Sequence, residues 1–128
     1  MGDKIRVEER IIFTETHLRL LKSRYAKLSI PINEAIRFVL NNLDDFAEYF
    51  HKNALKYLTR EDIVEKREKV WFEKELFDKL GEIVKKLRMK SPLASKKAVL
   101  SLAIVYYLER QETIEVEQKP KKSPQIVI

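Results

Sequence analysis

An internal repeat is the feature of this chain that most limits its possible folds. Residues 11–28 and 70–87 align without a gap, with apolar residues matched at both ends of the segment. In each copy a break that contains proline follows, and a second helical run comes after it, at residues 35–46 and 99–110. The repeated unit is therefore predicted to be one short strand followed by two helices. The identical pairs are Phe13/Phe72, Leu21/Leu80, Lys27/Lys86 and Leu28/Leu87.

Size and charge limit how such a repeat can be used. The chain has 128 residues, so each half would have only a marginal core of its own, and we expect the halves to pack together or to dimerise. Its net charge of +6 suits a polyanionic partner. No acidic residue occurs between Ile83 and Leu108, where a solvated lysine-rich loop is the alternative interpretation. The bases in this segment are Lys85, Lys86, Arg88, Lys90, Lys96 and Lys97.

Several classes of function are not indicated by the sequence. The chain has no cysteine, which excludes disulfides and thiolate catalysis. Its two histidines, His17 and His51, lie far apart without a ligand pattern, so neither a metal site nor another cofactor is expected. The pairs Asp44-Asp45 and Glu61-Asp62 accompany no nucleophile motif, and the protein is not expected to be an enzyme.

The apolar segments indicate a protein without a membrane span. The N-terminus lacks the apolar region of a secretory signal, which predicts a cytoplasmic protein. The most apolar run, residues 99–108, is about half the ~20 residues that span a bilayer, so a buried core helix is predicted there. The high content of charged residues, 36%, resembles the composition of hyperthermophile proteins.

Alternation along the two predicted strands, residues 9–14 and 68–72, separates an inward from an outward face. Ile11 and Phe13 match Val70 and Phe72 and are expected to point inward. The alternate residues then face solvent, on a two-stranded ribbon of a size that enters the DNA major groove. For Trp71 the alternative to a DNA contact is packing against a linker or a second chain. An outward Ile12 is equally suited to contact a thymine methyl group or a neighbouring protein surface. The outward residues are Arg10, Ile12 and Thr14 in the first strand and Lys69, Trp71 and Glu73 in the second.

The remaining pattern predicts where the helices begin and end. Thr14 is expected to cap a helix that runs to about Leu28, and Pro31 to open a second helix whose period continues towards Leu58. A short helix is predicted from Thr59, and the alternation of Ile114 and Val116 hints at a strand. The predicted divisions are a first repeat at 1–46, a helical linker at 47–66, a second repeat at 67–111 and a tail at 112–128.

Two helix openings carry a resemblance to a known family. The segments Ile32-Asn-Glu-Ala-Ile-Arg37 and Ala94-Ser-Lys-Lys-Ala-Val-Leu-Ser-Leu-Ala103 resemble the second helix of the ribbon-helix-helix DNA-binding regulators, the group of the Arc, methionine-repressor and CopG proteins. The resemblance implies a mainly α fold with a short β-ribbon: a tandem ribbon-helix-helix protein of two βαα units joined by a helical linker. It also implies phosphate contacts from the start of each second helix and base contacts from the outward strand residues. The implied base-contacting residues are Arg10, Ile12, Thr14, Arg67, Lys69 and Trp71. The implied phosphate-binding residues are Asn33, Lys90, Ser95, Lys96 and Lys97.

The function implied is that of a sequence-specific transcription regulator that binds double-stranded DNA. The tandem form resembles regulators encoded by archaeal viruses or plasmids. The repeats are expected to pair as an intramolecular pseudo-dimer or to form a homodimer, with higher oligomers on DNA left open. Two alternatives stand beside it: an antitoxin that captures a toxin with its tail, and a protein–protein scaffold without DNA binding, favoured by the acidic residues Glu8, Glu9, Glu68 and Glu73 around the strands.

Overall fold

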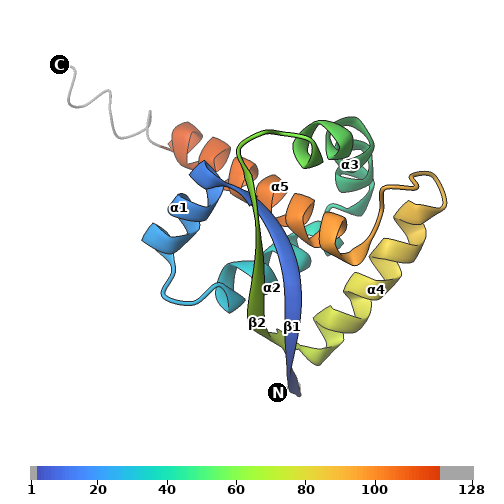
Figure 1. Ribbon diagram of the computed structural model, residues 1–128, viewed down its shortest axis with the longest axis horizontal. Coiled ribbons are helices and arrows are strands. Elements are labelled where there is room, and N and C mark those ends of the chain that lie inside the picture. The colour runs from blue at the N-terminus through green and yellow to red at the C-terminus, as the bar shows by residue number, and fades with distance from the viewer. Residues whose placement is uncertain (1–2, 119–128) are drawn as a thin grey trace.

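A computed structural model describes residues 3–118 of the chain, and the side chains of residues 3–111. Two strands and five helices follow one another in the order β1 (Lys4–Thr14), α1 (Glu15–Arg24), α2 (Ser29–Leu40), α3 (Leu43–Leu58), β2 (Ile63–Glu73), α4 (Lys74–Arg88) and α5 (Lys96–Gln118). The strands form a ribbon in front of the helices, and α5 passes behind it (Figure 1).

The ribbon is a two-stranded antiparallel sheet. β1 and β2 pair along their whole length, from Lys4 opposite Glu73 to Thr14 opposite Ile63. The two strands of the sequence repeat therefore pair within one chain. Backbone hydrogen bonds extend the ribbon at both ends, because the N–H of Glu15 donates to the carbonyl of Asp62 and the N–H of Lys74 to that of Asp3.

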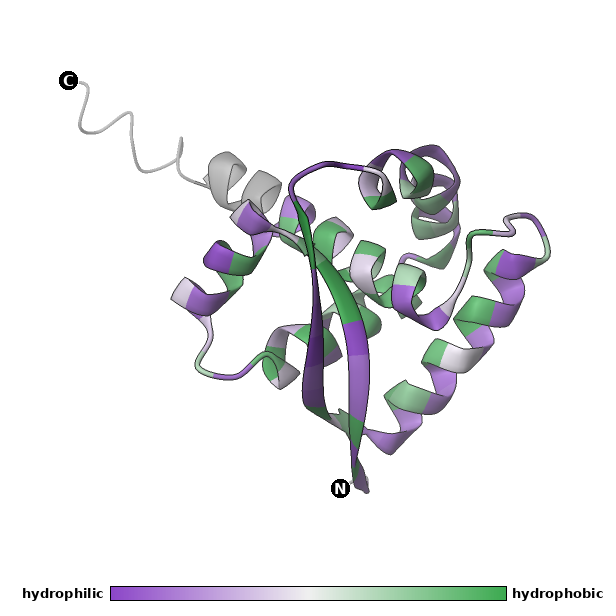
Figure 2. Ribbon diagram, in the orientation of Figure 1, coloured by the Kyte–Doolittle hydropathy of each residue, from purple (hydrophilic) through white to green (hydrophobic). Residues whose placement is uncertain are grey.

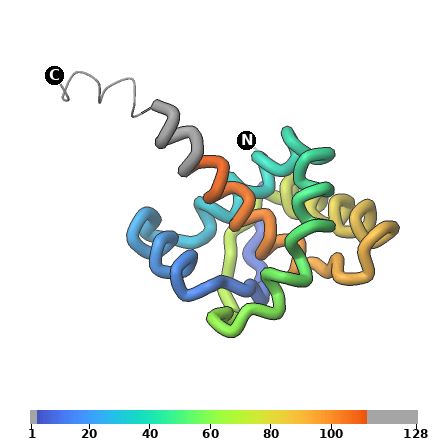
Figure 3. Tube along the Cα trace, turned by 90° about the horizontal axis from the view of Figure 1, so that it is seen from above, coloured from blue at the N-terminus to red at the C-terminus, as the bar shows by residue number. Residues whose placement is uncertain are grey.

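Helix α5 forms the centre of the core. Every residue of α5 from Ala98 to Leu108 is buried, which confirms the buried core helix predicted from the apolar run. The helix contacts α2, α3, α4 and β1, and it runs through the middle of the molecule when viewed from above (Figure 3). No helix within residues 3–118 has the length and apolar character that a membrane crossing requires.

Helices α2, α3 and α4 are amphipathic and pack against α5, whereas α1 packs against β1. In α4 the buried residues recur at three- and four-residue spacings, and the bases of its last turn lie on the other side. Apolar side chains from the strand ends complete the core, whereas the middle of the ribbon is hydrophilic (Figure 2). Ile11, Phe13, Val70 and Phe72 are all buried, so their predicted inward orientation is confirmed.

The predicted fold class, a tandem ribbon-helix-helix protein with two βαα units, is wrong. Residues 3–118 form a single two-stranded sheet and five helices, three of which follow β1 and two of which follow β2. The first helices after the strands also differ, with 10 residues in α1 and 15 in α4. The strands share one sheet and one core around α5, so the repeated sequence does not produce two repeated units.

Several predicted boundaries also need correction. The strands have 11 residues each and are not short. Helix α1 ends at Arg24 rather than Leu28, and the long helix predicted from Pro31 towards Leu58 breaks at Asn41 and Asn42, because asparagine disfavours helix interiors. Consequently the boundary predicted at residue 46 falls inside α3.

Two predicted elements after Leu58, a short helix from Thr59 and a strand near Ile114, are wrong. Thr59 ends α3, and β2 begins four residues later, so no short helix starts there. Helix α5 continues to Gln118, and the strand hinted at near Ile114 is a helix instead. The rest of the predicted tail, residues 119–128, lies outside the described residues.

Candidate nucleic-acid interface

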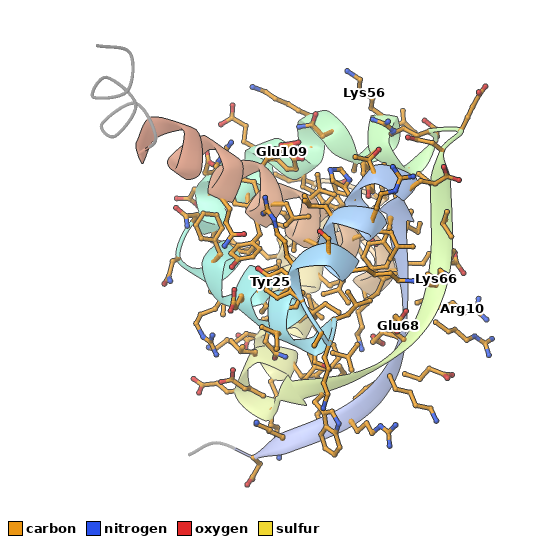
Figure 4. All side chains as sticks on the ribbon, turned by 90° about the vertical axis from the view of Figure 1, so that its left-hand side faces the viewer. Arg10, Tyr25, Lys56, Lys66, Glu68 and Glu109 are labelled. Carbon is orange, nitrogen blue, oxygen red and sulfur yellow. The ribbon has the colours of Figure 1, made fainter. Side chains whose placement is uncertain are left out.

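The outward face of the ribbon carries most of the predicted base-contacting residues. Exposed side chains alternate with half-buried or buried ones from Lys4 to Ile11 in β1 and from Val64 to Phe72 in β2. Arg10 lies on the outer side of the ribbon (Figure 4). This face bears five basic side chains, two carboxylates and one indole. They are Lys4, Arg6, Arg10, Arg67, Lys69, Glu8, Glu65 and Trp71.

Backbone hydrogen bonds show how close the outward side chains of the two strands lie. The N–H of Trp71 donates to the Ser29 hydroxyl, and the N–H of Ile12 donates to the Ser101 hydroxyl, so neither bonds to the partner strand. Trp71 with Arg6, and Ile12 with Glu65, are therefore non-hydrogen-bonded pairs, and so is every outward pair between them. In such pairs the opposite side chains approach most closely.

Two of these outward pairs are complementary and one is not. The Arg6 guanidinium lies 5.8 Å from the centre of the Trp71 ring, and Glu8 lies opposite Lys69. At the middle of the ribbon, however, Arg10 lies opposite Arg67. Like charges that face each other across a ribbon are destabilising.

Glu65 is close to this arginine pair but offsets its charge only in part, because the same carboxylate is bonded to Lys97. Glu65 is 3.8 Å from Arg10 and 2.9 Å from the Lys97 ammonium. The hydrogen bond from Lys97 lowers the pKa of Glu65 and keeps its carboxylate ionised. Arg67 and Lys69 form no ion pair with any side chain that the structure describes.

Acidic residues near the strands lie mostly away from the outward face. Glu9 and Glu68 are opposite each other on the inward side, and Figure 4 shows Glu68 and Lys66 on the side of the ribbon that faces the helices. Burial raises the pKa of Glu9, and the charge of Lys96 opposes this shift. Glu73 is bonded to Arg37.

Two predicted base-contacting residues are buried, so their predicted outward exposure is wrong. Ile12 is 8% exposed and Thr14 only 2%. Thr14 accepts a hydrogen bond from the N–H of His17 at 3.0 Å, as the predicted cap of α1, and its own N–H donates to the Tyr57 hydroxyl at 3.1 Å. Helices α3 and α5 therefore hold this end of β1 and cover it.

Asn33, a predicted phosphate ligand, has a structural role instead. Its side-chain amide donates to the carbonyls of Ser29 and Trp71, at 2.7 Å each, and its side-chain oxygen accepts from the N–H of Glu73 at 3.1 Å. These bonds fasten the start of α2 to the edge of β2. The polar capacity of the side chain is largely used by the fold.

The residues predicted at the start of α5 lie close together, but each already has a contact. Ser95 caps the helix by accepting from the N–H of Ala98 at 3.1 Å. The Lys96 ammonium lies 4.5 Å from the centre of the Phe77 ring, and Lys97 is paired with Glu65. Lys90 is exposed in the loop between α4 and α5.

Sequence reasoning missed Lys4 and Arg6, because it started the strand at residue 9. The signal was present, since polar Lys4 and Arg6 alternate with apolar Ile5 and Val7. The structure adds both bases to the outward face.

Comparison of the chain with protein-family models, with curated proteins and with solved structures finds no match. The resemblance to the ribbon-helix-helix regulators therefore stays a prediction. Within the described residues there is no group of three or more His, Cys, Asp or Glu side chains with the arrangement of a metal site.

Proposed function

We propose that this protein is a transcription regulator that binds double-stranded DNA sequence-specifically, with the outward face of the β1–β2 ribbon in the major groove. The observation that carries the proposal is the exposed pair of Arg10 and Arg67 at the middle of the ribbon. This pair costs stability in the free protein. Arginine is the side chain that most often contacts guanine, through two hydrogen bonds to O6 and N7.

The shape and charge of the ribbon support the same partner. A two-stranded ribbon fits the major groove, and this one curves around the helices so that its outer side stands free (Figure 4). Lys69 and Lys4 both lie between the arginine pair and the Lys4–Glu73 end of the ribbon, so the basic face continues in that direction towards the phosphates that border the groove. Of the four acidic residues that favoured a scaffold without DNA binding, Glu9 and Glu68 face the helices and Glu73 is bonded to Arg37, while Glu8 lies on the outward face opposite Lys69.

The two ends of the outward face differ, which defines the kind of DNA site expected. Trp71 is 48% exposed at one end, while Ile12 and Thr14 are covered at the other. A two-fold symmetric dimer would read a palindrome. This ribbon presents unlike ends, so we expect an asymmetric site with guanines near its centre.

Selection of bound sequences from a random DNA pool tests the proposal first. The enriched site is then synthesised with 7-deazaguanine, which lacks the N7 acceptor in the major groove, and separately with inosine, which lacks only the minor-groove amino group of guanine. We expect 7-deazaguanine at the central guanines to weaken binding by about 1–3 kcal/mol per arginine contact. Inosine should have much less effect. No enrichment, or equal sensitivity to the two changes, would contradict reading in the major groove.

A further inference from the structure

A pocket of about 560 Å³ lies where the ribbon meets α2. The first residue of β1, the loop before α2, the first turns of α2 and the end of β2 line it. This volume is within the range of sites for small molecules.

The two carboxylates of the pocket have bonding partners within the protein, and two of its lysines form no ion pair among residues 3–111. Glu73 is bonded to Arg37, and Glu34 accepts a hydrogen bond from the Tyr107 hydroxyl. Lys4 and Lys27 form no ion pair with any described side chain. The bond from the neutral hydroxyl leaves Glu34 charged, so the lining has three cations, Lys4, Lys27 and Arg37, against two carboxylates. The excess of one positive charge favours an anion.

The same pocket exposes two large apolar side chains. Trp71 and Ile30 are each 48% exposed and both line it. An indole face offers a stacking surface for a flat ring. We propose that this pocket binds a small aromatic carboxylate, with its ring against Trp71 and Ile30 and its carboxylate near Lys4 and Lys27.

A ligand in this pocket would cover one end of the outward face, because Trp71 and Lys4 belong to both. Interference with DNA binding is a consequence that rests on the proposed function. The existence of the ligand site does not depend on the proposed function, so ligand binding is tested without DNA.

Trp71 is the only tryptophan in the chain, so its indole N–H gives one assignable peak in a ¹H–¹⁵N spectrum. Three probes of one ring system are titrated: 2-naphthoate, 2-naphthalenemethanol and protonated 2-naphthylmethylamine. We expect 2-naphthoate to shift the Trp71 peak with a dissociation constant near or below about 1 mM, and the alcohol and the cation to bind more weakly. Equal binding of the alcohol, or no shift of the peak with naphthoate, would overturn the proposal.

A matched pair of variants tests the two ammonium groups. Lys4→Gln with Lys27→Gln should weaken 2-naphthoate binding roughly three- to tenfold, because exposed ion pairs are individually weak. Lys56→Gln with Lys85→Gln removes the same charge from exposed positions outside the pocket and should leave the affinity unchanged. Backbone spectra confirm that each variant is folded. Equal losses in both variants would show a general charge effect and no defined site.

Discussion

Single residues in the middle of the ribbon work against folding. Glu9 and Glu68 face each other on the inward side, where apolar residues would stabilise the sheet most. Arg10 and Arg67 face each other in the same way on the outward side, so this pair also brings like charges together. The inward pair has a partly buried member, Glu9, whose pKa is raised mainly by burial.

Replacing Glu9 by glutamine is expected to stabilise the protein at neutral pH. The pKa of Glu9 is higher in the folded than in the unfolded chain, so its ionised form opposes folding above that pKa. The gain should be on the order of 0.2–1 kcal/mol at pH 7, the range for cross-strand pairs. It should shrink to nothing as the pH falls through the raised pKa and Glu9 becomes protonated in the native protein.

Denaturant unfolding of the two proteins at pH 7 and pH 3.5 measures this difference. Glu8→Gln is the control, because Glu8 is exposed on the outward side opposite Lys69 and its loss should not stabilise. A destabilised Glu9→Gln variant at pH 7 would show that the attraction to Lys96 outweighs the cost of burial.

At the scale of elements, side chains of α2 form hydrogen bonds to the backbone along the edge of β2. Ser29 and Asn33 on the first turns of α2 bond to the backbone of Trp71 and Glu73. On the other strand, Ser101 of α5 and Tyr57 of α3 bond in the same way to Ile12 and Thr14. Both ends of the ribbon are thereby attached to the helices, while its middle carries the charged outward face.

Asn33→Ala is predicted to destabilise the protein by about 1–3 kcal/mol, because two hydrogen bonds to β2 are lost at about 0.5–1.5 kcal/mol each. Asn53→Ala is the matched control, since the amide of Asn53 makes one local bond to the Tyr49 carbonyl within α3. Denaturant unfolding gives both values. Equal losses would mean that the contact between α2 and β2 contributes little.

The sequence predicted the parts of the fold that depend on local pattern. The apolar run of α5 indicated a core helix, and the alternation around Phe13 and Phe72 indicated the inward strand faces. The run Glu8-Glu9-Arg10 interrupts that alternation, so the first half of β1 was missed. The helix break at Asn41 was missed because the apolar period continues across it.

The candidate site was predicted only where exposure follows from alternation. Arg10, Arg67, Lys69 and Trp71 are exposed as expected. Ile12 and Thr14 are covered by Ser101 and Tyr57, which are distant in sequence. No local pattern reports such a contact, and the same holds for the bonds that occupy Asn33.

Across the whole molecule, tyrosines attach the central helix and the ribbon to their neighbours. Tyr106 donates a hydrogen bond to Asp45 and Tyr107 to Glu34, and Tyr49 donates to Glu109. Burial raises the pKa of all three, and it raises the pKa of Tyr57 to about 12. The folded protein therefore keeps these protons at a pH where the unfolded chain loses them.

The protein is accordingly expected to lose stability as the pH rises above about 10, the ordinary pKa of tyrosine. The loss should reach up to about 1.4 kcal/mol per pH unit for each tyrosine that stays protonated in the fold. Denaturant unfolding at pH 8, 9.5 and 10.5 measures it, and Tyr57→Phe should lessen the slope. If tyrosinate absorbance equivalent to all five tyrosines appears near pH 10 while the protein is still folded, the buried hydroxyls are not protected as described.

The central claim, that the outward ribbon face reads DNA, is tested most directly by removing both central arginines. Arg10→Ala with Arg67→Ala should lose on the order of 2–6 kcal/mol on the selected site, at about 1–3 kcal/mol per base contact, and much less on random DNA. Arg19→Ala with Lys22→Ala removes the same charge from exposed positions on α1. This control should keep the ratio of specific to random binding. A folded Arg10/Arg67 double variant that also keeps the full ratio would contradict the account.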